Sequence, residues 1–170
     1  DGKICVCFGD SITGNMAPPC DYPTVLGDET GMTVYNGGFG GCRMSTHPTA
    51  AYAPFSMNKL ADSIASGDWS TQDAQVGNVS SYIHADVQLA NLKAVDWSKV
   101  DFITINYGTN DIASSVALDN ENNKKDTATL LGALRYSIET ILTAYPHIKI
   151  LLLTPIYRYW NDEDKDSDEK

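Results

Sequence analysis

Four apolar runs, each shorter than a typical helix, lie at wide intervals along the chain. They span Lys3–Phe8, Thr33–Tyr35, Asp101–Tyr107 and Lys149–Thr154. Continuous short runs of this kind are typical of strands in a parallel sheet, because helices cover both of its faces. The pattern therefore predicts four buried strands, with the first run near the middle of the sheet.

Helical spacing appears between the second and third runs. Met57, Leu60 and Ile64 fall on one face of the stretch Pro54–Ala65, and a proline suits the first turn of a helix. A further helix is predicted over about Ala85–Ala94. Both segments are interpreted as helices that turn apolar faces towards a core.

The strongest helical pattern lies between the third and fourth runs. We expect Asp126 to cap this helix and Pro146 to end it. Residues 22–26 could add one more helical turn earlier in the chain. The apolar stripe of the strong helix comprises Leu130, Leu131, Leu134, Ile138, Ile141, Leu142 and Tyr145.

Strands and helices thus alternate along the whole chain. Right-handed crossovers between successive strands then give an α/β fold built on one parallel sheet. The 170 residues are enough for one domain with a sizeable core.

Charge narrows the classes of function. The net charge is -10 at pH 7 and the pI is about 4.5, which argues against nucleic acid as a partner, since such binding depends on Lys and Arg. Residues 161–170 alone hold six acids and two lysines, a net charge of -4. No apolar run approaches the roughly 20 residues that cross a bilayer, so no membrane partner is predicted. The compartment stays open.

Four cysteines leave the redox environment open as well. Cys5 and Cys7 fall on the first predicted strand, where free cysteines behave as small hydrophobic residues. Cys20 and Cys42 fall in loops at one end of the sheet, and they either form a disulfide or stay free. None of the four has metal-site spacing, and no metal or other cofactor is predicted.

Candidate chemistry begins directly after the first strand. Gly9 breaks the apolar run, and Asp10, Ser11 and Thr13 are residues that favour helix caps, so the segment reads as strand, sharp turn and helix start. Ser11 therefore lies at the carboxyl end of a strand, where open α/β sheets bind ligands. The simpler alternative is that Asp10 and Ser11 only cap a helix.

Two later segments follow strands in the same way. Asn36–Gly41 holds four glycines after the second strand, and Gly108–Asp111 reads Gly-Thr-Asn-Asp after the third. The glycines either turn the chain or let backbone N–H groups approach a developing anion. Arg43 and His47 lie just beyond, as substrate contacts or as parts of a solvated loop.

In order and spacing, these three segments resemble the SGNH (GDSL-type) hydrolase family. The resemblance covers nearly the whole chain and implies a three-layer, flavodoxin-like parallel sheet with strand order 2-1-3-4. It implies that Ser11 is the nucleophile of an esterase and that Gly41 and Asn110 help to form the oxyanion hole. Asp10, Arg43 and His47 become candidate substrate contacts.

The family's fourth element, an Asp-x-x-His near the C-terminus, has no counterpart here. None of His47, His84 and His147 follows an aspartate by three residues. We interpret residues 1–160 as an SGNH hydrolase-like domain without its last strand and helix, and residues 161–170 as an acidic tail or the start of the missing part. The open edge of the fourth strand then needs a C-terminal segment or another chain to cover it, and the isolated chain is predicted to be nearly inactive.

The function predicted from the sequence is hydrolysis of a short-chain or carbohydrate O-acyl ester. The substrate would be a small molecule or a glycan, and the polar rim of Asn15, Arg43, His47 and residues 120–123 favours carbohydrate over lipid. A catalytically silent binding or structural module of the same fold is the alternative. A flavodoxin-like nucleotide binder fits poorly, because the glycine segment lacks a basic residue at the P-loop position.

Overall fold

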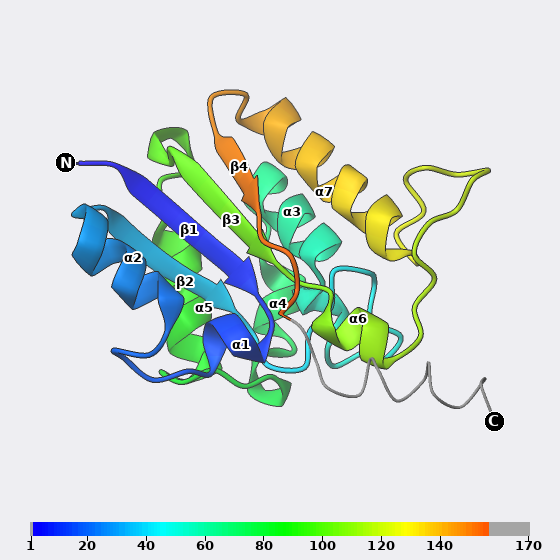
Figure 1. Ribbon diagram of the computed structural model, residues 1–170, viewed down its shortest axis with the longest axis horizontal. Helices are drawn as coiled ribbons and strands as arrows, with labels where there is room; N and C mark the ends of the chain where they lie inside the picture. Colours follow the sequence, from blue (N-terminus) through cyan, green and yellow to red (C-terminus); the bar gives the residue numbers. More distant parts are fainter. Residues whose placement is uncertain (1, 157–170) are drawn as a thin grey trace.

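The computed structural model describes residues 2–156 and places four parallel strands in one sheet. The strands are β1 (Ile4–Gly9), β2 (Thr33–Gly38), β3 (Phe102–Asn106) and β4 (Lys149–Leu152). Their order is β2-β1-β3-β4 (Figure 1), so the predicted strand order and the central position of the first strand are confirmed.

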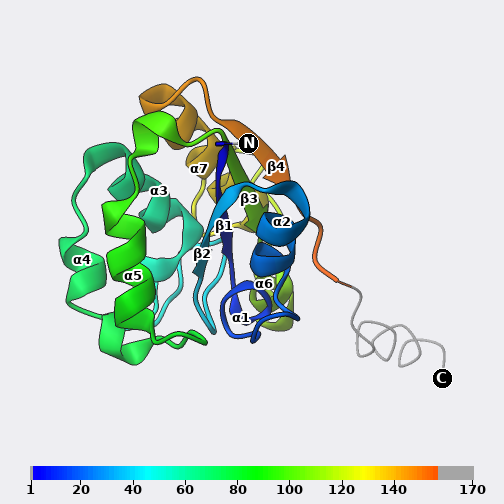
Figure 2. The same cartoon turned by 90° about the vertical axis from the view of Figure 1, so that its left-hand side faces the viewer.

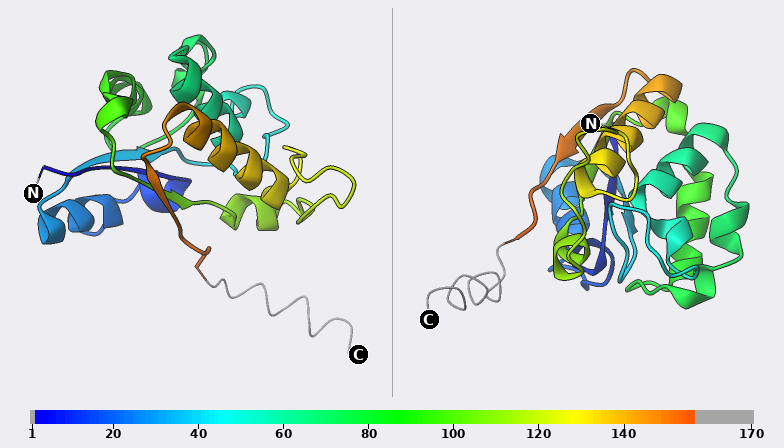
Figure 3. Two further views of the ribbon diagram at one scale, coloured as in Figure 1. Left: turned by 90° about the horizontal axis from the view of Figure 1, so that it is seen from above. Right: turned by 90° about the vertical axis from the view of Figure 1, so that its right-hand side faces the viewer.

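Helices cover the two faces of the sheet unequally. Figures 2 and 3 show α3, α5 and α7 on one face and α2 on the other. None of the helices within residues 2–156 is long and apolar enough to cross a bilayer. The helices are α1 (Ser11–Gly14), α2 (Tyr22–Thr30), α3 (Met57–Ser66), α4 (Ser70–Asp73), α5 (Ala85–Ala94), α6 (Thr109–Ala113) and α7 (Leu130–Ala144), with 3-10 turns at Ala53–Phe55, Val76–Asn78 and Trp97–Lys99.

The core lies between the sheet and the three helices α3, α5 and α7. Phe8 of β1 stacks on Trp97 with ring centroids 6.2 Å apart, and Trp97 stacks on Trp69 at 6.5 Å. Leu60 of α3 and Ile141 of α7 are fully buried in the same cluster. Both belong to the predicted apolar stripes, so these two helices are amphipathic as expected.

Three helix boundaries differ from the prediction. α3 begins at Met57 rather than at Pro54, because Ser56 has an extended backbone and Pro54 lies in the separate 3-10 turn Ala53–Phe55. α2 runs through Gly27 and ends only at Gly31, whose φ of 70° lies in the left-handed region that favours glycine. α7 is capped by Thr129, whose hydroxyl accepts a hydrogen bond from Gly132 N at 3.2 Å, rather than by Asp126. Asp126 instead accepts Ala128 N at 3.0 Å and holds the turn before the cap.

The fourth strand is shorter and more exposed than predicted. β4 ends at Leu152, not at Thr154, and the side chains of Leu151 and Leu152 are 46% and 52% exposed. The reason is its place at the edge of the sheet. Leu151 lies on the face where α2 does not reach β4 (Figure 3). An apolar hollow of about 320 Å³ lies on this bare face, lined by Cys5, Tyr22, Leu26, Met32, Phe102, Thr104, Leu151 and Leu153. Leu152 instead lines a second hollow on the other face, of about 210 Å³, with Leu130 and Leu134 of α7.

All four cysteines are free, so the disulfide alternative for Cys20 and Cys42 is wrong. Cys20 is exposed, whereas Cys42 is fully buried and its burial raises the pKa of the thiol to about 12. Cys5 and Cys7 are buried on β1 as expected.

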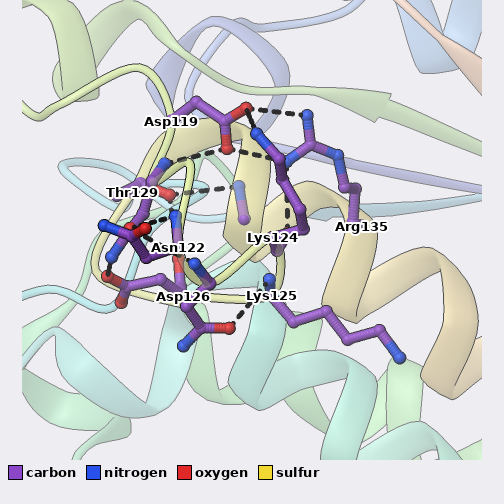
Figure 4. Close-up of polar contacts among 10 residues, drawn as sticks. Asp119, Asn122, Lys124, Lys125, Asp126, Thr129 and Arg135 are labelled. Carbon is purple, nitrogen blue, oxygen red and sulfur yellow. Dashed lines mark hydrogen bonds and ion pairs between the residues drawn. The ribbon is translucent and has the colours of Figure 1, made fainter.

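The polar loop that precedes α7 is ordered by charge pairs (Figure 4). Asp119 accepts two hydrogen bonds from Arg135, at 2.7 and 3.1 Å, and a third from Lys124 at 3.2 Å. The hydrogen bonds from Arg135 hold the pKa of the Asp119 carboxyl well below its usual range. Further on, Thr127 O accepts Thr46 N at 2.8 Å, which ties this loop to the segment that follows the glycines.

Candidate active site

Three strands end level with one another at the carboxyl edge of the sheet. Gly9 at the end of β1 pairs with Gly38 of β2 and with Asn106 of β3. Ser11, Gly41 and Asn110 follow these three residues by two, three and four positions. The predicted site residues therefore leave the sheet at the same edge, where Figure 1 shows α1 and α6 beyond the strand ends.

The first loop is a capped turn that exposes the serine. Asp10 is 1% exposed and its carboxylate accepts Ile12 N at 2.9 Å, which makes it the N-cap of α1. Ser11 is the first residue of that helix and its side chain faces solvent. The first N–H groups of a helix have no partner within it, so both the hydroxyl and the N–H of Ser11 are suited to meet a ligand. Asp10 fits the simpler reading of a cap, since its burial leaves little surface for the predicted substrate contact.

The glycine segment packs directly on α1. A Cβ on Gly38 would lie 2.5 Å from Gly14 N, closer than atoms can approach, so only glycine permits this packing. Asn36 strengthens the contact, because its amide donates to Thr13 O at 2.8 Å and its carbonyl oxygen accepts Gly38 N at 2.9 Å. The segment 36–41 is thereby fixed relative to the turn that carries Ser11.

Gly41 has φ of 78°, a conformation in the left-handed region. A Cβ there would also lie 3.3 Å from the ring of Tyr52. Tyr52 in turn contacts the ring of His47, with centroids 5.0 Å apart. An aromatic pair thus borders Gly41, and sequence reasoning missed Tyr52 because no motif or periodicity marks it.

Asn110 reaches the glycine segment from the third loop. Its side-chain nitrogen donates to Cys42 O at 2.9 Å, one residue beyond Gly41. An amide nitrogen carries two hydrogens, so the second stays available for another acceptor. The structure thus brings the predicted Asn110 donor to the predicted Gly41 loop.

Asp111, the next residue, makes an even denser set of contacts. This fully buried carboxylate accepts Met44 N and Ser45 N, each at 3.0 Å, and the Ser45 hydroxyl at 2.6 Å. Sequence reasoning gave Asp111 no role, although it stands in the Gly108–Asp111 motif. Its spacing alone could not show that its partners lie more than 60 residues earlier.

Arg43 and His47 also lie in the loop that follows the glycines. The Arg43 guanidinium donates to Ser114 Oγ at 2.5 Å, and its side chain is half-buried. His47 Nδ1 accepts Thr49 N at 3.0 Å. Burial and then the charge of Arg43 lower the pKa of His47, so the ring is neutral at pH 7, with Nδ1 as the acceptor and the proton on Nε2.

That tautomer does not suit a general base at Nε2, because the free lone pair of the ring is the one that Thr49 N–H occupies. His147 is exposed and precedes β4, whose first residue pairs with Phe102 at the opposite edge of the sheet. His84 is exposed at the start of α5. Among the contacts within residues 2–156, no hydrogen bond joins a histidine to Ser11.

The segment before His84 does lie at the carboxyl edge. Gly40 N donates to Ser80 O, and Tyr82 N donates to Gly14 O, both at 2.8 Å. Asn15 adds a side-chain hydrogen bond to Ser80 Oγ at 2.9 Å. Residues 80–82 therefore form one wall beside α1. Within the described part of the chain, no cluster of His, Cys, Asp or Glu side chains has an arrangement that could hold a metal ion.

The fold and these loops define an α/β protein with an exposed serine and an asparagine amide at the carboxyl edge of its parallel sheet, residue types that serine hydrolases use as nucleophile and oxyanion donor. The GDSL-like lipase/acylhydrolase family model matches residues 7–169. The chain belongs to this family.

Comparison with solved structures supports the fold. A crystal structure from Lactobacillus plantarum has a TM-score of 0.58 and 19% sequence identity, over 91% of this chain and 57% of that one. A GDSL-like lipase structure from Bacteroides ovatus has a TM-score of 0.53 and 15% identity, over 99% of this chain and 80% of that one. The present chain thus spans little more than half of the first relative. No match was found among curated proteins.

Proposed function

We propose that this protein is a serine esterase that hydrolyses a short-chain or carbohydrate O-acyl ester. Ser11 Oγ attacks the ester carbonyl carbon, and the resulting tetrahedral intermediate expels the alcohol to leave an acyl group on Ser11. A water molecule then attacks the acyl carbon and releases the acid. Family membership supports the reaction class, and the polar side chains around the site support the substrate class.

The oxyanion of the intermediate would be bound by Ser11 N–H, Gly41 N–H and the Asn110 amide. Backbone and amide donors suit this task because they carry no charge that has to be desolvated. In other hydrolases the loss of one such donor costs about a hundred- to a thousand-fold in kcat.

The observation that carries the proposal is the Asn110–Cys42 hydrogen bond. It joins the loop after β3 to the loop after β2, at the edge of the sheet where Ser11 follows β1.

The general base is proposed to come from outside residues 2–156. His47 has the wrong tautomer, and no described histidine is bonded to Ser11. We propose that a segment following β4, or another chain, supplies the base and covers the bare edge of the sheet. Leu151 with the apolar hollow that it lines, and exposed Leu152 and Ile156, support such a cover.

The substrate class is proposed from the polar groups at the carboxyl edge. Asn15, Arg43 and His47 are in the neighbourhood of the three loops, and the loop at residues 120–123 is polar and exposed. Hydroxyl-rich ligands make use of such groups more than lipids do. The preferred substrate is therefore an acetylated sugar rather than a long-chain lipid.

The test compares the 170-residue chain with a form extended at the C-terminus, each treated with a fluorophosphonate probe and with p-nitrophenyl acetate. Labelling at Ser11 and turnover are expected in the extended form, at a rate at least about a hundredfold above the 170-residue chain. Ser11→Ala in the extended form is the matched control and should abolish labelling. Labelling that survives Ser11→Ala would refute the assigned nucleophile.

A silent binding module of the same fold is the second candidate, favoured by the absence of a histidine bonded to Ser11 within the described residues. It predicts no labelling of Ser11 in either form. Labelling of the short form at the same rate as the long one would instead place the base within the 170 residues.

A further inference from the structure

Two segments carry the proposed oxyanion donors, and their separation must be held within a fraction of an ångström for catalysis. Gly41 belongs to the loop after β2, and Asn110 belongs to α6 after β3. These loops are not neighbours in sequence, so side-chain contacts have to fix one against the other. The strongest link between them does not involve either donor.

That link is the Asp111 carboxylate. Each of its oxygens accepts a backbone N–H, from Met44 to one and from Ser45 to the other, and the second oxygen also accepts the Ser45 hydroxyl at 2.6 Å. Met44 and Ser45 are 3% and 1% exposed, and Asp111 is 0% exposed. Hydrogen bonds to a buried charged acceptor are about twice as strong as neutral ones, so these three bonds form a rigid joint.

We propose that Asp111 is a positioning residue that sets the geometry of the oxyanion hole. It follows Asn110 on α6, and it accepts hydrogen bonds from the loop that begins three residues after Gly41. It therefore fixes the position of the Asn110 amide relative to Gly41 N–H. The Asn110–Cys42 bond and the Arg43–Ser114 bond run between the same two segments. Asp111 is buried and does not touch substrate. The proposal rests on the esterase function proposed above.

Asp111→Asn tests this joint with little change of shape. An amide NH2 would replace one carboxylate oxygen and would face an N–H donor, leaving one backbone donor without an acceptor. Asp101→Asn is the matched control, because the Asp101 carboxylate also accepts a backbone N–H, from Ile4 at 3.0 Å, but at the opposite edge of the sheet. Both variants lose one buried or half-buried carboxylate contact, and only one of them adjoins the site.

Two readouts separate positioning from mere stability. In amide hydrogen exchange of the 170-residue chain, Asp111→Asn should lower the protection of Met44 and Ser45 N–H by at least about tenfold and shift the Gly41 N–H resonance. With the extended, active form and p-nitrophenyl acetate, kcat should fall about ten- to a hundredfold while KM stays within twofold. Asp101→Asn should leave both readouts at wild-type values.

If Asp111→Asn does not fold, Ser45→Ala gives the second test, because it removes only the 2.6 Å bond. It should lower kcat severalfold and leave KM unchanged. A kcat within twofold of wild type for a folded Asp111→Asn or Ser45→Ala protein overturns the proposal, as does an equal loss in Asp101→Asn.

A failure of the proposed esterase function would give a different experimental result. If wild type and Ser11→Ala hydrolyse the ester equally, the esterase assignment is wrong. The exchange experiment then still decides on Asp111: unchanged protection and an unshifted Gly41 resonance overturn the positioning role, and their loss supports it.

Discussion

Gly38→Ala tests the packing that fixes Ser11 against the glycine segment. The added Cβ would lie 2.5 Å from Gly14 N and 2.7 Å from Thr13 Cβ, whereas unstrained contacts are about 3.5 Å or more. The backbone of α1 would therefore have to move by about 1 Å, because both neighbours are main chain or β-carbon atoms that cannot rotate away. Overpacking of this kind costs about 1–3 kcal/mol.

The assay is urea unfolding followed by circular dichroism, with Gly77→Ala as the matched control. Gly77 is exposed and a Cβ there would meet nothing within 4 Å, so the control should stay within about 0.5 kcal/mol of wild type. Gly38→Ala should lower the free energy of unfolding by about 1–3 kcal/mol without changing the m-value. In the extended form it should also lower kcat, by up to about a hundredfold for a displacement of about 1 Å. Equal stability of the two variants would refute the close packing of α1 on β2.

Three further predictions address other parts of the molecule. In native chain at pH 8, a disulfide-exchange reagent should titrate one thiol rapidly, that of Cys20, because the other three cysteines are buried; rapid reaction of two or more would contradict the described core. Arg135→Gln should remove stability that depends on pH. The folded pKa of Asp119 lies below its unfolded value of about 3.9, so the ion pair stabilises the protein above that pH. In thermal unfolding, the stability advantage of wild type over Arg135→Gln should therefore shrink as the pH falls from about 5 to 2. A difference that does not change with pH would exclude this linkage. Finally, Leu151→Lys should change the free energy of unfolding of the 170-residue chain by no more than about 0.5 kcal/mol, but should lower that of the extended form by about 1–3 kcal/mol. Equal effects on the two forms would argue against a cover over β4.

The hydrophobic pattern determined the strands, the three long helices and their alternation. Apolar runs and helical stripes report on burial over a few residues, and that is a local property that the sequence carries directly. Asp10 was placed at a helix start for the same reason, since an N-cap acts within three residues. The strand order came from resemblance to a family, because the alternation of elements does not fix which strands are neighbours.

Boundaries that depend on competition between nearby caps were predicted less well. Asp126 and Thr129 are both good caps, and the structure selects Thr129 because Asp126 already closes the preceding turn. The prediction that β4 is buried was wrong for a different reason. An apolar strand shows that some surface needs covering, but only the arrangement of α2 and α7 around the sheet shows which face stays bare.

At the site, the positions after strands pointed to Ser11 and the two later segments, and the roles of Ser11, Gly41 and Asn110 came from resemblance to a family and stay predictions. Only the tertiary structure showed that Asn110 bonds to Cys42, that Asp111 grips Met44 and Ser45, and that the lone pair of His47 is occupied. These contacts join residues from separate loops or depend on how a ring is turned. Their geometry is set by the packing of the whole sheet, and no local pattern of residue types encodes it.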